Sequence, residues 1–89
     1  MELNKLELPK WFAGEIYEKG DVISNPQTNE EIELNNLELS MYDFIMGSEM
    51  LVEMMGDKTP STYKKYLNEG LDWFEKSNPT AYKFFNFSK

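Results

Sequence analysis

The chain contains no cysteine, no histidine and no arginine among its 89 residues. Without imidazole or thiolate groups it lacks the usual general bases, nucleophiles and disulfides. It also lacks the usual protein ligands of zinc, haem iron and iron–sulfur clusters. We therefore expect no catalytic residue, no metal site and no cofactor, and a protein that is not an enzyme.

Positive charge is scarce as well. Nine lysines stand against sixteen aspartates and glutamates, so the formal net charge is -7. Binding to a phosphate backbone requires a basic patch, and arginine supplies the bidentate grip on phosphates and guanine edges. The composition therefore argues against a nucleic-acid partner.

Long hydrophobic runs are also missing. Charged residues interrupt the sequence so often that no stretch approaches the roughly 18–20 apolar residues of a membrane span. Residues 1–5 have neither the basic nor the apolar region of a signal peptide. We expect no membrane association and a cytoplasmic location.

Apolar side chains are nevertheless numerous enough for one folded domain spanning residues 1–89. Hydrophobic residues make up 40% of the chain and aromatic residues 15%, unlike the composition of disordered chains. The length leaves no room for a second core. Residues 1–14 are expected to form an arm, in which Trp11 and Phe12 either attach the arm to the core or form an exposed recognition element.

Residues 15–34 predict a small β-hairpin, because β-favouring side chains alternate there with turn residues. Asp21–Ser24 is expected to pair with Glu30–Glu33. Pro26 belongs in the turn, since proline cannot donate a ladder hydrogen bond. A third strand around Ile16 would turn the hairpin into a meander.

An acidic cluster lies in the second strand of this hairpin, formed by Glu30, Glu31 and Glu33. Carboxylates are ligands for Ca²⁺ and Mg²⁺, but these three lack the spacing of a calcium-binding loop. Glu31 and Glu33 share one face of the strand. A solvated strand face that discourages edge pairing is therefore the simpler interpretation.

Residues 35–56 predict the central helix. Asn35 and Glu38 have the spacing of a capping box, and Gly56 is a natural helix terminator. At 100° per residue, one apolar arc is wide enough to face a core. It comprises Leu37, Met41, Phe44, Ile45, Ser48, Leu51, Val52 and Met55.

A second apolar run lies on the opposite side of this helix. It comprises Leu39, Met46, Met50 and Met54, with Tyr42 and Asp43 beside it. The arm or the C-terminal aromatic residues could cover this run, or it could form an interface with a second copy or with a foreign partner. Asp43 is the acid with the most apolar setting. It is either a candidate for acid–base chemistry or an exposed side chain that accepts a hydrogen bond from a neighbouring Tyr or Lys.

Residues 59–78 predict an amphipathic helix that packs by one face, with Thr59 as N-cap and Pro60 at the first position. Gly70 lies in the middle of the apolar face, which indicates a close approach of another element. Pro79 begins a short last helix over residues 79–87. The short connection between the two long helices predicts that they pack antiparallel.

The fold class that follows is α+β: a small N-terminal β-hairpin packed on two antiparallel helices, with a short C-terminal helix. The expected core combines apolar residues of each element. It comprises Ile16, Val22, Ile23, Ile32, Leu37, Met41, Phe44, Ile45, Val52, Tyr63, Leu67, Leu71, Phe74 and Phe85.

Several segments resemble short uncharacterised proteins of marine phage and metagenomic origin. They are residues 8–12, the Asn25–Pro26 turn, residues 38–47 and residues 71–74. Lysine and asparagine without arginine are also what an AT-rich coding sequence yields. The resemblance implies a phage origin, and with it the cytoplasm of a bacterial host, but no known activity.

The sequence favours a non-enzymatic protein–protein interaction module, with self-association as a homodimer or an unknown protein partner. The candidate interface residues are Leu39, Tyr42, Asp43, Met46, Met50, Met54, Trp11 and Phe12. One alternative is a phage-encoded acidic inhibitor that mimics nucleic acid toward a host protein. Another is a carboxylate-based divalent-metal or enzymatic site at Asp43 or at the acidic cluster.

Overall fold

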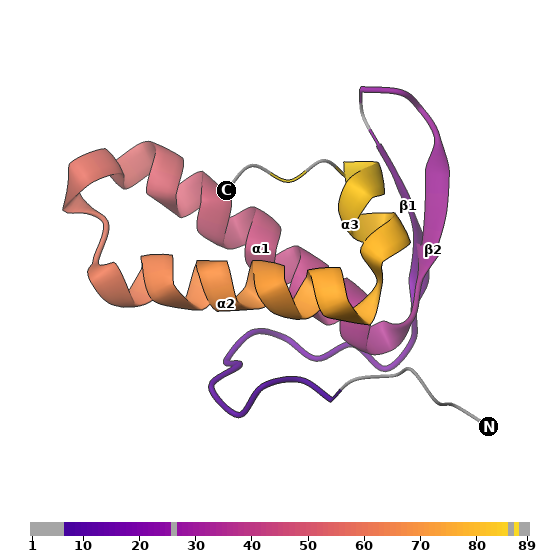
Figure 1. The fold of residues 1–89 in the computed structure, drawn as a ribbon, viewed down its shortest axis with the longest axis horizontal. Helices are drawn as coiled ribbons and strands as arrows, with labels where there is room; N and C mark the ends of the chain where they lie inside the picture. Colours follow the sequence, from indigo (N-terminus) through magenta and orange to yellow (C-terminus); the bar gives the residue numbers. More distant parts are fainter. Residues whose placement is uncertain (1–6, 26, 86, 88–89) are drawn as a thin grey trace.

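The computed structural model describes residues 7–25, 27–85 and 87, and within them the chain has the expected α+β architecture. A two-stranded hairpin precedes two long antiparallel helices and a short final helix (Figure 1). The hairpin and the final helix pack at the same end of the long helices, and the N-terminal arm runs along one side of them. No helix in the described part is long and apolar enough to cross a membrane.

Strands β1 (Asp21–Ser24) and β2 (Glu31–Leu34) form an antiparallel pair in which Asp21 lies opposite Leu34. The register is thus one residue later on the second strand than the sequence predicted. Asn25 sets this register, because its backbone N–H donates to Glu30 O and its carbonyl accepts from Asn29, which has a left-handed φ of 63°. The predicted place of Pro26 in this turn lies outside the described residues. No third strand forms around Ile16.

Helix α1 (Asn36–Met55) begins at the predicted capping box. The Asn35 side chain accepts from Glu38 N at 2.8 Å, and the Glu38 carboxylate accepts from Asn35 N at 2.9 Å. The helix ends at Gly56, whose φ of 55° is costly for residues with a Cβ. A single turn of 3₁₀-helix, η1 (Gly56–Lys58), then leads toward the next helix.

Helix α2 (Ser61–Ser77) starts slightly later than predicted, with Pro60 and not Thr59 at the N-cap position. The Thr59 hydroxyl instead donates to Gly56 O at 2.7 Å, so it closes the connection rather than capping the helix. Helix α3 (Pro79–Phe85) begins at Pro79 as predicted, and the Asn78 side chain caps it by accepting from Ala81 N.

The core lies where α1, α2, α3 and β2 meet. Its fully buried apolar residues are Leu34, Met41, Ile45, Leu71, Phe74 and Ala81. Helical periodicity predicted four of them, but not Leu34 and Ala81. Other predicted core residues pack against this cluster while partly buried: Ile23, Ile32, Phe44, Leu67 and Phe85. Leu37 and Val52 are also only partly buried.

Three predicted core residues are exposed instead: Ile16, Val22 and Tyr63. Ile16 precedes the hairpin and is not part of a strand. Val22 faces away from the side of β1 that carries Ile23, since side chains alternate along a strand. Tyr63 is in the first turn of α2, and that end of the helix pair lies opposite the end that the hairpin and α3 cover (Figure 1).

The C-terminal end of the predicted core-facing arc of α1 is also exposed. Leu51 and Met55 belong to the arc that was expected to face the core, yet both are more than one-third accessible to solvent. They lie in the last turns of α1, at the uncovered end of the helix pair (Figure 1). The apolar arc therefore extends beyond the elements available to cover it.

Candidate functional site

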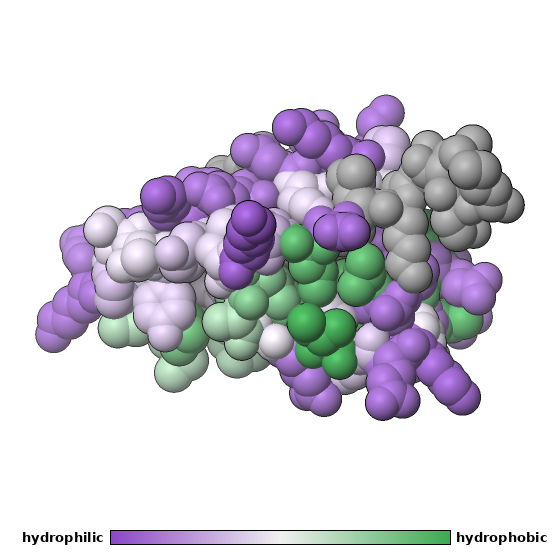
Figure 2. Space-filling model, turned by 90° about the horizontal axis from the view of Figure 1, so that it is seen from below, coloured by the Kyte–Doolittle hydropathy of each residue, from purple (hydrophilic) through white to green (hydrophobic). Residues whose placement is uncertain are grey.

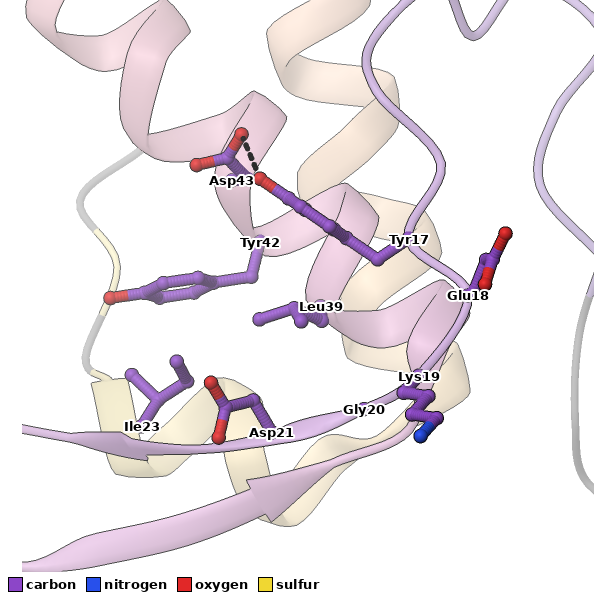
Figure 3. A pocket seen from close by; sticks show the side chains of 9 residues that line it. All are labelled: Tyr17, Glu18, Lys19, Gly20, Asp21, Ile23, Leu39, Tyr42 and Asp43. Atoms are coloured by element: carbon purple, nitrogen blue, oxygen red, sulfur yellow. Dashed lines mark hydrogen bonds between the residues drawn. The ribbon is translucent and has the colours of Figure 1, made fainter.

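A cavity of about 530 Å³ opens between the segment that enters β1 and the first half of α1 (Figure 3). Its lining combines aromatic, aliphatic and acidic side chains from two parts of the chain. They are Tyr17, Glu18, Lys19, Gly20, Asp21, Ile23, Leu39, Tyr42 and Asp43.

The periods of the two elements explain why these side chains meet. Residues two apart share a face of a strand, so Asp21 and Ile23 both face α1. Residues three and four apart share a face of a helix, so Leu39, Tyr42 and Asp43 line the other wall. Figure 3 shows Asp21 and Ile23 directed toward Leu39 and Tyr42 across the cavity, with Asp43 beyond Tyr42 and beside Tyr17.

Ser40 holds the entering segment against α1. Its Oγ accepts from Tyr17 N at 2.9 Å and donates to Asn36 O at 2.7 Å, while Asn36 Nδ2 donates to Tyr17 O at 3.2 Å. Ser40 is almost fully buried. Both backbone polar groups of Tyr17 are thus paired with α1, which fixes the position of its ring at the cavity.

Gly20 allows the chain to turn from this segment into β1. A Cβ at this position would lie 2.0 Å from the carbonyl oxygen of Leu34, far inside van der Waals contact with backbone that cannot move aside easily. A residue without a side chain is therefore required, and the close approach places Asp21 at the mouth of the cavity.

Two tyrosines line the cavity, and one of their hydroxyls contacts an acid. The Tyr17 hydroxyl donates to Asp43 Oδ2 at 3.2 Å. Desolvation raises the pKa of Tyr17, and the hydrogen bond and negative charge of Asp43 raise it further. Desolvation and the same carboxylate raise the pKa of Tyr42. Both hydroxyls therefore remain protonated donors at neutral pH.

Asp43 has the second of the two settings considered for it. It is exposed and accepts a hydrogen bond from a tyrosine of a neighbouring segment. The acidic residues of β2 do not gather into a metal site: across residues 7–25, 27–85 and 87, no three acidic side chains are close enough to share an ion.

The outward face of α1 continues beyond the cavity as the Met strip, which comprises Met46, Met50 and Met54. These side chains are 42%, 62% and 76% exposed, rising toward the end of the helix. A different view, from below onto the side of the arm and α2, shows a further area of hydrophobic surface with hydrophilic residues around it (Figure 2). Neither the arm nor the C-terminal aromatic residues described here cover the Met strip.

Gly47 lies on the same outward side, next to Met54 on the helical wheel. A Cβ added there would meet nothing within 4 Å. Glycine in the middle of an exposed helix weakens that helix relative to alanine, and no contact within the described part of the chain requires its small size.

Leu39 and Tyr42 separate from the Met strip in the structure. Leu39 is partly buried at the cavity, and the Tyr42 ring packs on Phe85 with centroids 4.6 Å apart. The predicted second face of α1 is therefore divided. Its first half is partly covered by the entering segment and by α3, and its second half is open.

Trp11 and Phe12 attach the arm to the helices. The Trp11 ring stacks on Tyr66 at 4.8 Å, and both Trp11 and Phe12 contact Phe44. Trp73 Nε1 donates to Glu7 O at 2.8 Å, which adds a polar anchor. This confirms the interpretation of the pair as an attachment to the core.

A second, shallower hollow of about 270 Å³ lies along the arm. It is lined by Pro9, Trp11, Glu69, Asp72, Trp73 and Lys76. Its charged side chains are two acids, Glu69 and Asp72, and one base, Lys76, so it lacks the concentration of like charge found at the main cavity.

Sequence reasoning missed several residues of the main cavity: Tyr17, Asp21 and, as supports, Gly20 and Ser40. Residues 17–21 carried a turn signal in Gly20, but nothing in the local pattern indicated that they would return to α1.

Searches against protein-family models, curated proteins and solved structures find no match to this chain.

Proposed function

We propose that this protein is a non-enzymatic interaction module that pairs with a second copy of itself through the outward face of α1. The observation that carries the proposal is the Met strip, which leaves three large apolar side chains exposed in successive turns of one helix. Burial of apolar surface is the main favourable term in most protein association.

The charge distribution favours a second copy at this face. The whole chain carries a net charge of -7, so two copies repel each other across most of their surfaces. The Met strip and Gly47 are neutral, and a two-fold axis places the same neutral patch on both sides of an interface. Methionine adapts its shape to a facing surface, which suits the meeting of two identical strips.

Gly47 supports close packing of the two helices. Its exposed Cα allows the backbone of a second α1 to approach more closely than any side chain would permit. Glycine destabilises an exposed helix, and in the isolated chain no described contact offsets this loss of stability. In a dimer, the close contact with the second α1 offsets it.

The test is the molar mass by light scattering on a size-exclusion column over a hundredfold range of concentration. We expect the wild-type protein to dimerise and Met50→Glu to remain a folded monomer, because two carboxylates would face each other across the interface. Val22→Glu is the matched control, since it introduces the same charge at an exposed apolar residue on another element.

A wild-type protein that stays monomeric over the whole range would refute self-association. So would dimers that Met50→Glu leaves intact, because another surface would then hold the copies together. A circular dichroism spectrum of each variant separates loss of pairing from loss of folding.

A further inference from the structure

The cavity between β1 and α1 is large enough to hold part of a ligand. Its volume of about 530 Å³ lies within the roughly 300–1,000 Å³ typical of small-molecule pockets. It is distinct from the Met strip, although both use the outward face of α1. Its lining indicates which chemistry it would accept.

The inner walls suit an aliphatic stem. Ile23 and Leu39 supply apolar surface from opposite sides, and the rings of Tyr17 and Tyr42 supply aromatic surface (Figure 3). The Tyr42 ring is held in place by its packing on Phe85. Aromatic faces also attract cations through the ring quadrupole.

The polar groups at the cavity suit a positive charge. Asp21 Oδ1 accepts from Val22 N at 2.7 Å, and Asp43 Oδ2 accepts from the Tyr17 hydroxyl at 3.2 Å. Each carboxylate is thus oriented through one oxygen, while its second oxygen has no hydrogen-bond partner in the described part of the chain.

Among the described residues, Lys19 is the only lysine that lines the cavity. Figure 3 shows the Lys19 side chain directed away from the cavity, and Glu18 adds a further negative charge at the rim. Neither Asp21 nor Asp43 forms a salt bridge with a described residue, and the sequence contains no arginine. Anionic ligands are disfavoured here by three carboxylates and by the negative charge of the whole chain.

We infer that this cavity binds the side chain of an arginine or lysine in a basic peptide, with the aliphatic stem between Ile23 and Leu39 and the charged end at Asp21, while Asp43 on the opposite side of the cavity adds negative charge. The cavity exceeds the volume of one side chain, so flanking peptide atoms occupy part of it. The carboxylates supply charge-assisted hydrogen bonds, and the tyrosine rings supply cation–π contacts. The inference does not depend on dimerisation.

The test is a titration of the ¹⁵N-labelled Met50→Glu variant with short capped peptides at low salt. Binding is monitored by the changes in amide NMR chemical shifts. The probe is acetyl-Gly-Arg-Gly-amide, and its matched control contains citrulline, which keeps the shape of arginine without the charge. We expect saturable shifts at Gly20, Asp21 and Leu39 with the arginine peptide, and binding at least about threefold weaker with citrulline, the size expected for one exposed ion pair.

Variants of the protein locate the charge. Asp21→Asn and Asp43→Asn should each weaken arginine-peptide binding by about threefold. Asp57→Asn is the control and should not, because Asp57 is an exposed acid in η1 at the far end of α1. Equal effects of all three substitutions would show only general electrostatic attraction and would overturn the inference.

Three further outcomes would also overturn it: no saturable shift with the arginine peptide, equal binding of the citrulline peptide, or shifts confined to residues outside the cavity. Spermidine is titrated in parallel. If it binds more tightly than the peptide at the same residues, the ligand is a free polyamine and the peptide assignment is wrong. Because the Met50→Glu variant is used, failure of this test leaves the dimer proposal unaffected.

Discussion

Replacing Gly47 with alanine should strengthen the isolated chain and weaken its dimer. In the isolated chain a Cβ at this position meets nothing within 4 Å, so the substitution introduces no clash. Alanine is more favourable than glycine in a helix interior by about 0.8–1.0 kcal/mol. The whole of that difference should therefore appear in the free energy of unfolding.

A gain of about 1 kcal/mol corresponds to a rise in melting temperature of about 4–8 °C for a domain of this size. The measurement is urea and thermal unfolding in a Met50→Glu background, where pairing does not contribute. Size-exclusion light scattering in the wild-type background then reports the dimer. There the added methyl group should lower the dimer fraction, because it occupies the point of closest approach.

Gly70→Ala is the matched control within α2. A Cβ there would lie 3.1 Å from the Met41 sulfur and 3.6 Å from Ile45 Cγ1, both of which belong to fully buried side chains. The same gain in helix propensity is then offset by crowding, so we expect little or no net stabilisation.

Two results would refute this reasoning. If Gly47→Ala is no more stable than its parent in the monomeric background, then Gly47 makes contacts within the chain that the structure does not show. If the alanine variant dimerises as well as the wild-type protein, then α1 does not pack closely at Gly47.

Three other substitutions test the interior and its charges. Leu71→Ala should lower the free energy of unfolding by about 2–5 kcal/mol, as for other fully buried leucines, measured by urea unfolding. Ser40→Ala should cost about 1–2 kcal/mol, because it leaves Tyr17 N without its acceptor, and amide exchange at Tyr17 should accelerate. Burial and the neighbouring Glu53 raise the pKa of Glu49, whose Oε2 has no hydrogen-bond partner among the residues that the structure describes. The folded state thus holds this proton to higher pH than the unfolded chain, so stability falls as pH rises from about 4.5 through the raised pKa. Glu49→Gln should remove this loss and stabilise the protein at neutral pH by about 0.5 kcal/mol; an unchanged pH profile would contradict the assignment.

Local sequence signals predicted the helices well, because their causes lie within a few residues. The capping box of Asn35 and Glu38 and the proline at the start of α3 appear where expected. The close approach inferred at Gly70 is also present, since its Cα faces Met41. Such features depend on backbone groups of the same turn, which the sequence displays directly.

The hairpin register and the cavity depended on contacts between distant residues. A shift of one residue decides which side chains face the core, and it is Leu34 that β2 buries completely. Likewise, Ser40 appeared as an ordinary polar residue within a helix. Its role becomes visible only when Tyr17, 23 residues earlier, is seen to bond to it. The sequence indicated two apolar sides of α1, but nothing in the wheel indicated that the entering segment would cover only the first half of the second side.

The polar contacts between the two ends of the chain also bear on how it folds. Asn25 Nδ2 donates to Phe84 O across 59 positions of sequence, and Trp73 Nε1 donates to Glu7 O across 66. Closing loops of this length costs conformational entropy before the contacts at their ends stabilise the fold. Proteins rich in such contacts therefore fold more slowly than simple helical hairpins. The pair α1 and α2 can associate early through a short connection. The turn of the hairpin acquires its anchor only when α3 is in place, so the first and last thirds of the chain complete the native state together.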